Sequence, residues 1–170
     1  MEKISPEDNK AQIKSLTRKT LQKIVQFEES KPLDILGPHK LKFNNSVIVN
    51  AYLPDAINAF LLIKGRRKKI EMQKLNSDGI FQAVFENFKE VFSYKILIEN
   101  EKNERIEIFD PYSFPVKLSD LDLHLLGEGN HYKSFEKLGA RFQTNNKVKG
   151  VHFALWAPDA KCISVVGEFN

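Results

Sequence analysis

The residue types that can move protons cluster in one stretch of the sequence. Asp110, Tyr112, Glu128 and His131 supply carboxyl, phenol and imidazole groups, which general acid–base catalysis uses. They stand among prolines, glycines and aromatic residues without a regular period, as in a packed connector. We therefore interpret these four side chains as turn and connector residues that lock neighbouring domains together. We predict no catalytic residue in this chain.

Other candidates for chemistry lack the patterns that their chemistry needs. The spacing of the four histidines does not match that of metal ligands, so we predict no metal and no cofactor: His39, His124, His131 and His152. Gly127-Glu128-Gly129 lacks the third glycine and the following helix of a phosphate-binding loop. Cys162, the only cysteine, is interpreted as a small buried residue. With no disulfide and no apolar leader at residues 1–6, a cytoplasmic location is expected.

The charge of the chain is mildly basic, with a net charge of +4 and a pI of about 9.0. Its densest basic run, residues 64–69, lacks the interleaved aromatics of a nucleic-acid patch. We interpret this run as a solvated hairpin turn, with a basic nucleic-acid binder as the rival hypothesis. No apolar run approaches the roughly 18 residues that span a membrane. Neither a nucleic acid nor a membrane is therefore expected as a partner.

One amphipathic helix is expected ahead of the β-structure, over residues 5–29. Ser5 is a suitable N-cap and Pro6 suits the first helical position. Apolar residues recur at helical spacing on one face: Ile13, Leu16, Ile24 and Phe27. The helix should end near Lys31, because the residue before a proline disfavours helix. Such a helix is marginal alone, so it must pack against the domain that follows.

From Leu33 to about Phe114 the hydrophobic period changes to two. Strand-like runs fall at residues 46–53, 59–63, 80–85, 94–99 and 105–109. Short strands separated by regular turns indicate an all-β, immunoglobulin-like sandwich. Residues 116–145 are interpreted as a connector, in which Asp120–Leu123 alternates polar and apolar residues as in a polar-out strand or an extended segment. Strand patterning resumes at residues 150–158 and 162–167.

The two β-stretches share an order of short motifs, which indicates an internal repeat. Leu36-Gly37 and Leu138-Gly139 are 102 residues apart, and the Pro-Asp-Ala triplets at Pro54 and Pro158 are 104 apart. We predict two tandem sandwiches. Few residues follow the strands of the second copy, so we expect it to be truncated, with one face and one edge uncovered.

Several segments resemble the amino-terminal part of bacterial glycogen branching enzymes. They are Leu36-Gly37-Pro38-His39, then Asp110-Pro111-Tyr112-Ser113-Phe114, then Leu118 to Ala140, and Gly150 to Asn170. The resemblance covers roughly residues 33 to 170. It implies two amino-terminal β-sandwiches, the second a carbohydrate-binding module, ahead of a (β/α)8 barrel and a carboxy-terminal β-domain. It also implies an α-glucan partner and favours a monomer for the full-length enzyme, while the oligomeric state of this chain is left open.

The resemblance implies an enzyme that transfers an α-1,4 glucan segment to a 6-hydroxyl with retention of configuration. Its nucleophile and acid/base carboxyl groups belong to the barrel. No catalytic residue can therefore be carried onto this sequence, and the chain alone is expected to be inactive. The alternative is a stand-alone glucan-binding or scaffold sandwich without catalysis.

Trp156, the only tryptophan, is the candidate carbohydrate-binding residue. Sugar C–H groups stack on a flat aromatic face, and the resemblance extends to the glycogen-binding module of the AMP-activated kinase β subunit, which stacks glucan on a matching tryptophan. An apolar strand surrounds Trp156, so a core position is the alternative. Tyr52 occupies the similar place in the first copy, where a core position is favoured.

These observations predict four regions in an all-β chain. They are an N-terminal helix at residues 1–31, a first β-sandwich at 32–115, a connector at 116–145, and the start of a truncated carbohydrate-binding β-sandwich at 146–170.

Overall fold

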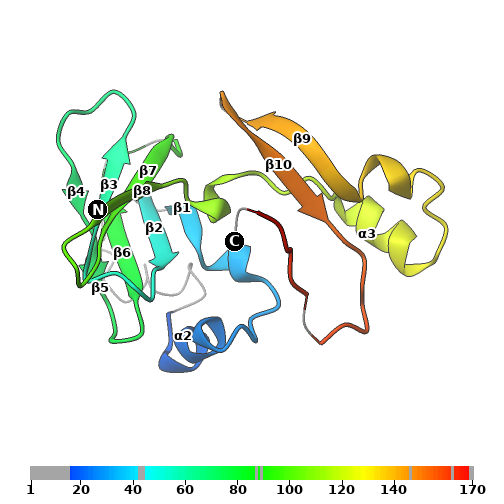
Figure 1. The fold of residues 1–170 in the computed structure, drawn as a ribbon, viewed down its shortest axis with the longest axis horizontal. Helices are drawn as coiled ribbons and strands as arrows, with labels where there is room; N and C mark the ends of the chain where they lie inside the picture. The colour runs from blue at the N-terminus through cyan, green and yellow to red at the C-terminus, as the bar shows by residue number, and fades with distance from the viewer. Residues whose placement is uncertain are drawn as a thin grey trace, which may run out of the picture. The chain divides into compact units, whose positions relative to one another are not determined.

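The computed structural model describes residues 16–41, 45–86, 88, 90–145, 147–161 and 163–168. The chain forms two compact units, residues 1–114 and residues 115–170, and most of its regular structure is antiparallel sheet (Figure 1). The prediction of an all-β fold with an N-terminal helix is confirmed. The predicted domain boundaries stay a prediction.

Helix α2, Arg18–Val25, opens the described part of the chain. Thr17 is its N-cap, with extended backbone (φ −65°, ψ 152°), and the Thr17 hydroxyl accepts a hydrogen bond from the Thr20 amide at 3.2 Å. One continuous helix over residues 5–29 is therefore wrong, because the chain is extended at Thr17. The expected cap at Ser5 lies outside the described residues. After the helix, Phe27 adopts a left-handed φ of 56°.

The first unit is a sandwich of two four-stranded antiparallel sheets. One sheet has the order β1 (Gly37–Leu41), β2 (Ser46–Tyr52), β6 (Ile80–Phe85), β5 (Gln73–Lys74), and the other β4 (Ile70–Glu71), β3 (Asn58–Ile63), β7 (Tyr94–Glu99), β8 (Arg105–Ile108). The five strands predicted here are confirmed to within one residue at each end. The short edge strands β1, β4 and β5 were not predicted. They are recognised by their hydrogen-bonded pairing with a neighbouring strand, and their sequences carry no clear alternation of apolar residues.

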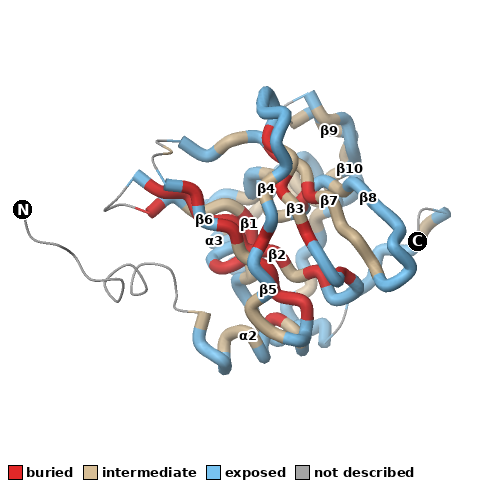
Figure 2. Tube along the Cα trace, turned by 90° about the vertical axis from the view of Figure 1, so that its left-hand side faces the viewer, coloured by how far each residue is buried: buried red, intermediate tan, exposed pale blue. Residues whose placement is uncertain are grey.

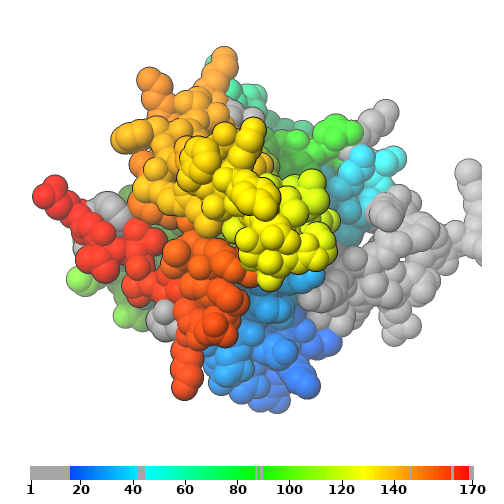
Figure 3. Space-filling view, turned by 90° about the vertical axis from the view of Figure 1, so that its right-hand side faces the viewer, coloured from blue at the N-terminus to red at the C-terminus, as the bar shows by residue number. Residues whose placement is uncertain are grey.

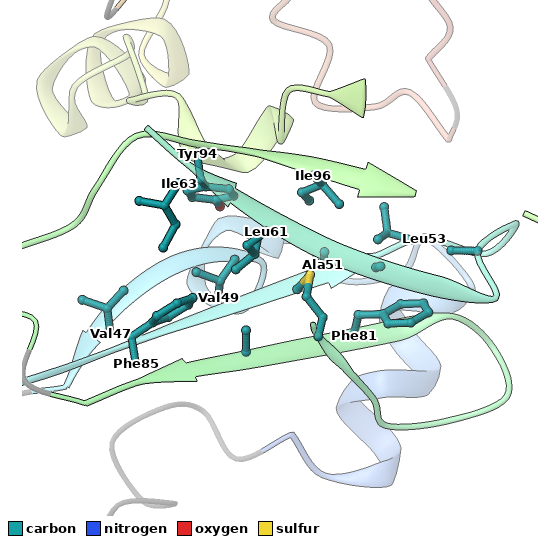
Figure 4. Packing of buried hydrophobic residues seen from close by; sticks show 14 residues of the cluster. Val47, Val49, Ala51, Leu53, Leu61, Ile63, Phe81, Phe85, Tyr94 and Ile96 are labelled. Atoms are coloured by element: carbon teal, nitrogen blue, oxygen red, sulfur yellow. The ribbon is translucent and has the colours of Figure 1, made fainter. Parts of the chain in front are cut away.

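Alternate residues of the inner strands fill the space between the two sheets. Val47, Val49 and Ala51 of β2 point toward Leu61 of β3 and Ile96 of β7 (Figure 4). Each of these side chains is at most 3% exposed. Period-two alternation places them on one face of each strand, as sheet-on-sheet packing requires.

The opposite face of the β1–β2 sheet carries the helix. Buried Ile24 of α2 packs with Ile35, Leu36 and Ile80. Between them Asn50, fully buried, donates to the Ile35 carbonyl at 2.9 Å and accepts from the Gln82 amide at 2.9 Å. The amphipathic helix thus packs against the sandwich, as its sequence predicts.

Gly37 begins β1 where the 3₁₀ turn η2 (Pro111–Ser113) packs against the strand. Its φ is +89°, and a Cβ added there would lie 2.6 Å from the Tyr112 carbonyl oxygen. Two motifs that are far apart in sequence, Leu36–His39 and Asp110–Phe114, therefore meet at this point. Only glycine permits both the backbone conformation and the close approach.

The second unit contains helix α3 (Asp120–Gly127), the 3₁₀ turn η3 (Ser134–Glu136) and a hairpin of β9 (Gly139–Asn145) and β10 (Val148–Ala154). The extended segment expected at Asp120–Leu123 is wrong, because Ser119 and Asp122 form a capping box that starts α3. No strand forms at residues 163–166 either, although a strand was predicted there. In Figure 2 both hairpin strands are half-buried or exposed throughout.

The hairpin repeats the start of the first sandwich at a constant distance in sequence. The starts of η1 (Pro32–Asp34) and η3, of β1 and β9, and of β2 and β10 are each 102 residues apart. Gly37 and Gly139 both have a φ of +89°. Because the Pro-Asp-Ala triplets are 104 apart, the second copy has two extra residues between Ala154 and Pro158. Counted from the strand starts, Tyr52 corresponds to Ala154, and counted from the triplets it corresponds to Trp156, so its equivalence with Trp156 stays a prediction.

Truncating Leu61 should destabilise the first unit strongly. Leu61 is fully buried between the sheets, so Leu61→Ala is expected to lower the free energy of unfolding by about 2–5 kcal/mol. Leu62→Ala is the matched control, because Leu62 is only half-buried on the other face of β3. Urea unfolding followed by circular dichroism measures both variants. Equal losses would contradict the assignment of the core.

The effect of the contact between Gly37 and Tyr112 on stability can be separated from the effect of backbone strain by comparing two glycine variants. Gly37→Ala should lower stability by clearly more than Gly65→Ala. Both glycines have left-handed φ, +89° and +84°, but a Cβ at Gly65 meets nothing within 4 Å. The shared left-handed penalty is about 1–2 kcal/mol. If thermal unfolding shows the same loss for both variants, the close approach to Tyr112 does not constrain position 37.

Candidate functional site

The Asp110 carboxylate is a buried structural lock in the first unit. It is 2% exposed, and it accepts hydrogen bonds from the Tyr94 hydroxyl and, at 2.9 Å, from the Tyr112 amide. Burial raises the pKa of Asp110, although the bonds from Tyr94 and Tyr112 oppose that shift. Burial, followed by the neighbouring Asp110 charge, raises the pKa of Tyr94 as well. A carboxylate closed off in this way holds η2 against β7 and cannot reach a substrate.

The Asp122 carboxylate has the same structural role in the second unit. Its Oδ2 accepts from the Ser119 amide at 2.8 Å, the Ser119 hydroxyl at 2.7 Å and the Lys137 ammonium at 3.2 Å. His131 Nε2 lies 2.9 Å from Oδ1, and the Asp122 side chain is 10% exposed. These donors, Ser119 first, lower the pKa of Asp122. The cluster ties α3 to the turn before β9, and residues 120–137, in yellow, form a continuous surface in Figure 3.

The four side chains first considered for acid–base chemistry thus have separate structural roles. Asp110 and Tyr112 belong to the lock in the first unit. His131 pairs with Asp122, while Glu128 lies on the surface of α3, 3.4 Å from His124 Nε2. All of these contacts lie inside a single unit, so the interpretation that the four residues lock neighbouring domains together stays a prediction.

Sequence reasoning missed the residues that complete the two locks. The spacing of Ser119 and Asp122 is that of a capping box, a signal that could have identified α3 and its cap. No local pattern pairs Tyr94 with Asp110, because the two residues lie on different elements. The same holds for Lys137, which reaches Asp122 across 15 residues.

Trp156 lies two residues beyond the end of β10, with its side chain 39% exposed. An accessible aromatic ring at this position can stack on a flat apolar ligand face. Tyr52, by contrast, is half-buried and packs against the cluster of Ile24, Ile35 and Leu36. The carbohydrate contact of Trp156 stays a prediction.

The basic run at residues 64–69 forms the exposed turn between β3 and β4. Two of its cations lie over aromatic rings, Arg66 at 4.6 Å from the Phe88 centroid and Lys69 at 3.8 Å from that of Phe60. These two contacts hold the turn against its own unit. They agree with the interpretation of the run as a solvated hairpin turn. Among the described residues, no helix is long and apolar enough to cross a membrane. That part of the chain also holds no cluster of three or more metal-ligating side chains.

Acid should weaken the second unit through Asp122. Because the folded pKa is lowered, the stabilisation is complete above the unfolded pKa of about 4 and is lost as the pH falls toward the folded pKa. Asp122→Asn should flatten the loss of stability below about pH 5. Asp120→Asn, on the same helix, is the matched control. Denaturant unfolding followed by the fluorescence of Trp156 measures all three proteins, and an unchanged acid profile in Asp122→Asn would contradict the lock.

Comparison with known proteins places the first unit in a family. A family model described as "alpha-1,4-glucan branching enzyme GlgB, N-terminal domain" matches residues 17–112. The branching enzyme GlgB of Nostoc sp. is 39% identical over 151 residues, which are 87% of this chain and 20% of that protein. The Synechocystis sp. enzyme is 41% identical over 143 residues, 82% of this chain and 18% of that protein. The chain thus spans about a fifth of the length of these relatives.

Solved structures give weaker similarity. The apo pullulanase of Paenibacillus barengoltzii has a TM-score of 0.39 and 17% identity, covering 53% of this chain and 16% of that protein. The Bacillus subtilis type I pullulanase complexed with maltose has a TM-score of 0.38 and 18% identity, covering 78% of this chain and 14% of that protein. The sequence matches carry the assignment: this chain belongs to the 1,4-α-glucan branching enzyme (GlgB) family and represents its amino-terminal region.

Proposed function

We propose that this chain is the amino-terminal glucan-contact and scaffold region of a 1,4-α-glucan branching enzyme. The observation that carries the proposal is the family match over residues 17–112, which includes the whole first sandwich. The transfer of an α-1,4 segment to a 6-hydroxyl is then the activity of a longer, cytoplasmic protein. The chain alone is expected to produce no branches.

The scaffold part of the proposal is supported by the positions of the motifs that resemble those of glycogen branching enzymes. Leu36–His39 and Asp110–Phe114 meet through the close contact of Gly37 with Tyr112. The segment from Leu118 to Ala140 is tied by the Asp122 cluster. Each motif thus supplies a buried or half-buried lock to its own unit, as expected of residues that keep a support rigid.

The glucan-contact part of the proposal is supported by Trp156. Trp156 is 39% exposed two residues beyond the end of β10, and an α-glucan presents C–H faces that can stack on an aromatic ring. Relatives of the chain are named 1,4-alpha-glucan branching enzymes. An α-glucan is therefore the ligand to test first.

Native electrophoresis in gels with and without glycogen tests glucan contact. The 170-residue chain should be retarded by glycogen, and Trp156→Ala should lose most of that retardation. Tyr132→Ala is the matched control, because Tyr132 is an aromatic residue of the same unit and 91% exposed. It should migrate like the parent chain.

Two outcomes would contradict the glucan contact. Unchanged mobility of the folded parent chain would show that it does not bind glycogen. Equal retardation of the parent and Trp156→Ala would place the contact elsewhere. Iodine staining of amylose incubated with the chain checks the expected lack of branching, and a shift of the stain toward that of branched glucan would overturn it.

A further inference from the structure

The turn between β5 and β6 contains an aspartate directly before a glycine, Asp78-Gly79. An aspartyl–glycyl junction is chemically labile, because the following residue has no side chain to hinder attack of its amide nitrogen on the aspartyl carboxyl carbon. Every other aspartate of the sequence precedes a residue with a side chain, and no asparagine precedes a glycine. The sequence therefore has a single junction of this kind.

Few contacts hold the two reacting groups of this junction. Asp78 is exposed, and its carboxylate accepts hydrogen bonds from the Asn76 side-chain amide at 3.2 Å and the Ser77 hydroxyl at 3.5 Å. Both distances lie at or beyond the long end of the range for such bonds. The Gly79 backbone amide has no hydrogen-bond acceptor among the described residues. The carboxyl group and the amide can therefore meet after the loss of two long, exposed hydrogen bonds.

The two buried aspartates are protected against the same reaction. The Asp122 carboxylate is held by donors on three other residues, and Asp122 precedes Leu123. Asp110 is buried and precedes Pro111, whose nitrogen has no hydrogen to lose. At Asp78, by contrast, an exposed carboxylate and an unhindered amide nitrogen occur together.

The chain on both sides of the junction is fixed. The Ile80 amide donates to Asn76 Oδ1 at 2.9 Å, and the Gly79 carbonyl accepts from the Leu53 amide at 2.7 Å. Gly79 has a left-handed φ of +92°, and a Cβ added there would lie 2.5 Å from the Leu53 carbonyl oxygen. The length of backbone between these fixed points therefore matters to the turn.

We propose that Asp78 is a site of spontaneous isomerisation to L-isoaspartate. The Gly79 nitrogen bonds to Cγ of Asp78, and one carboxylate oxygen leaves as water with the amide hydrogen and a proton from solvent. The product is a five-membered succinimide. Water then adds to the former main-chain carbonyl carbon of Asp78 and breaks its bond to the nitrogen. That carbon becomes a free carboxylate, the nitrogen regains a hydrogen, and one proton returns to solvent.

The product has the same mass as the parent chain and one more backbone carbon, because the main chain now runs through Cβ and Cγ of residue 78. This carbon has to fit between the fixed points of the turn. Leu53, whose amide is bound to the Gly79 carbonyl, belongs to the core between the sheets (Figure 4). Isomerisation should therefore loosen the turn and lower the thermal stability of the first unit.

Ageing the folded 170-residue chain at neutral pH and physiological temperature for several weeks tests the proposal. L-isoaspartate is quantified by methyl transfer from S-adenosylmethionine with an isoaspartyl methyltransferase, and it is located by mass spectrometry of peptides. Asp78→Glu should lose nearly all of the signal, because closure of the larger six-membered ring is slow. Asp78→Asn should gain signal, because ammonia leaves more readily. Asp55→Glu is the matched control, because Asp55 is also exposed in a turn but precedes Ala56.

Each outcome decides for or against isomerisation at Asp78. Isoaspartate at residue 78 that disappears in Asp78→Glu and persists in Asp55→Glu supports it. A folded chain that stays unmodified at residue 78, while the chain unfolded in guanidinium is modified there, overturns it, because the folded turn then protects the junction. Isoaspartate mainly at another aspartate also overturns it. The aged isomer, separated by ion exchange, should melt at a lower temperature than the parent, and an unchanged melting temperature would overturn the loosening of the turn.

Discussion

Apolar side chains on one face of a β-sheet leave water only when a second layer covers that face. In the first unit, two sheets of four strands cover one another, and α2 covers the outer face of one of them. The described part of the second unit has a single two-stranded sheet, with Phe142, Val151 and Phe153 exposed on one face. The same local architecture, repeated at 102 residues, thus occurs once with its covering layer and once without it.

Buried carboxylates hold the irregular segments that the sheets cannot hold. The Asp110 carboxylate fixes the turn after β8, and that of Asp122 fixes the start of α3 and the turn before β9. The two carboxylates offset the cost of their removal from water in different ways. Asp110 has neutral donors and a raised pKa, whereas Asp122 has a lysine among its donors and a lowered pKa. In both cases a buried carboxylate is stabilised by hydrogen bonds from the segments that it holds together.

The sequence predicts the elements whose signal is local. Alternating apolar residues mark β2, β3, β6, β7 and β8, since burial of one strand face imposes a period of two. The helix boundary at Thr17 was not predicted. The amphipathic pattern continues through this threonine, so the sequence does not indicate that its backbone is extended. Helix α3 was missed because Leu121 and Leu123 alternate with aspartates, and the capping box decides the conformation instead. Contacts between distant segments, such as Tyr94 with Asp110 and Gly37 with Tyr112, follow from topology and have no local signal.

The two extra residues between Ala154 and Pro158 distinguish the second copy from the first. They lie after the last paired residue of β10, so they change neither the ladder nor the side-chain alternation of the hairpin. The length of the segment that carries Trp156 can therefore change without shifting any cross-strand pair of the hairpin.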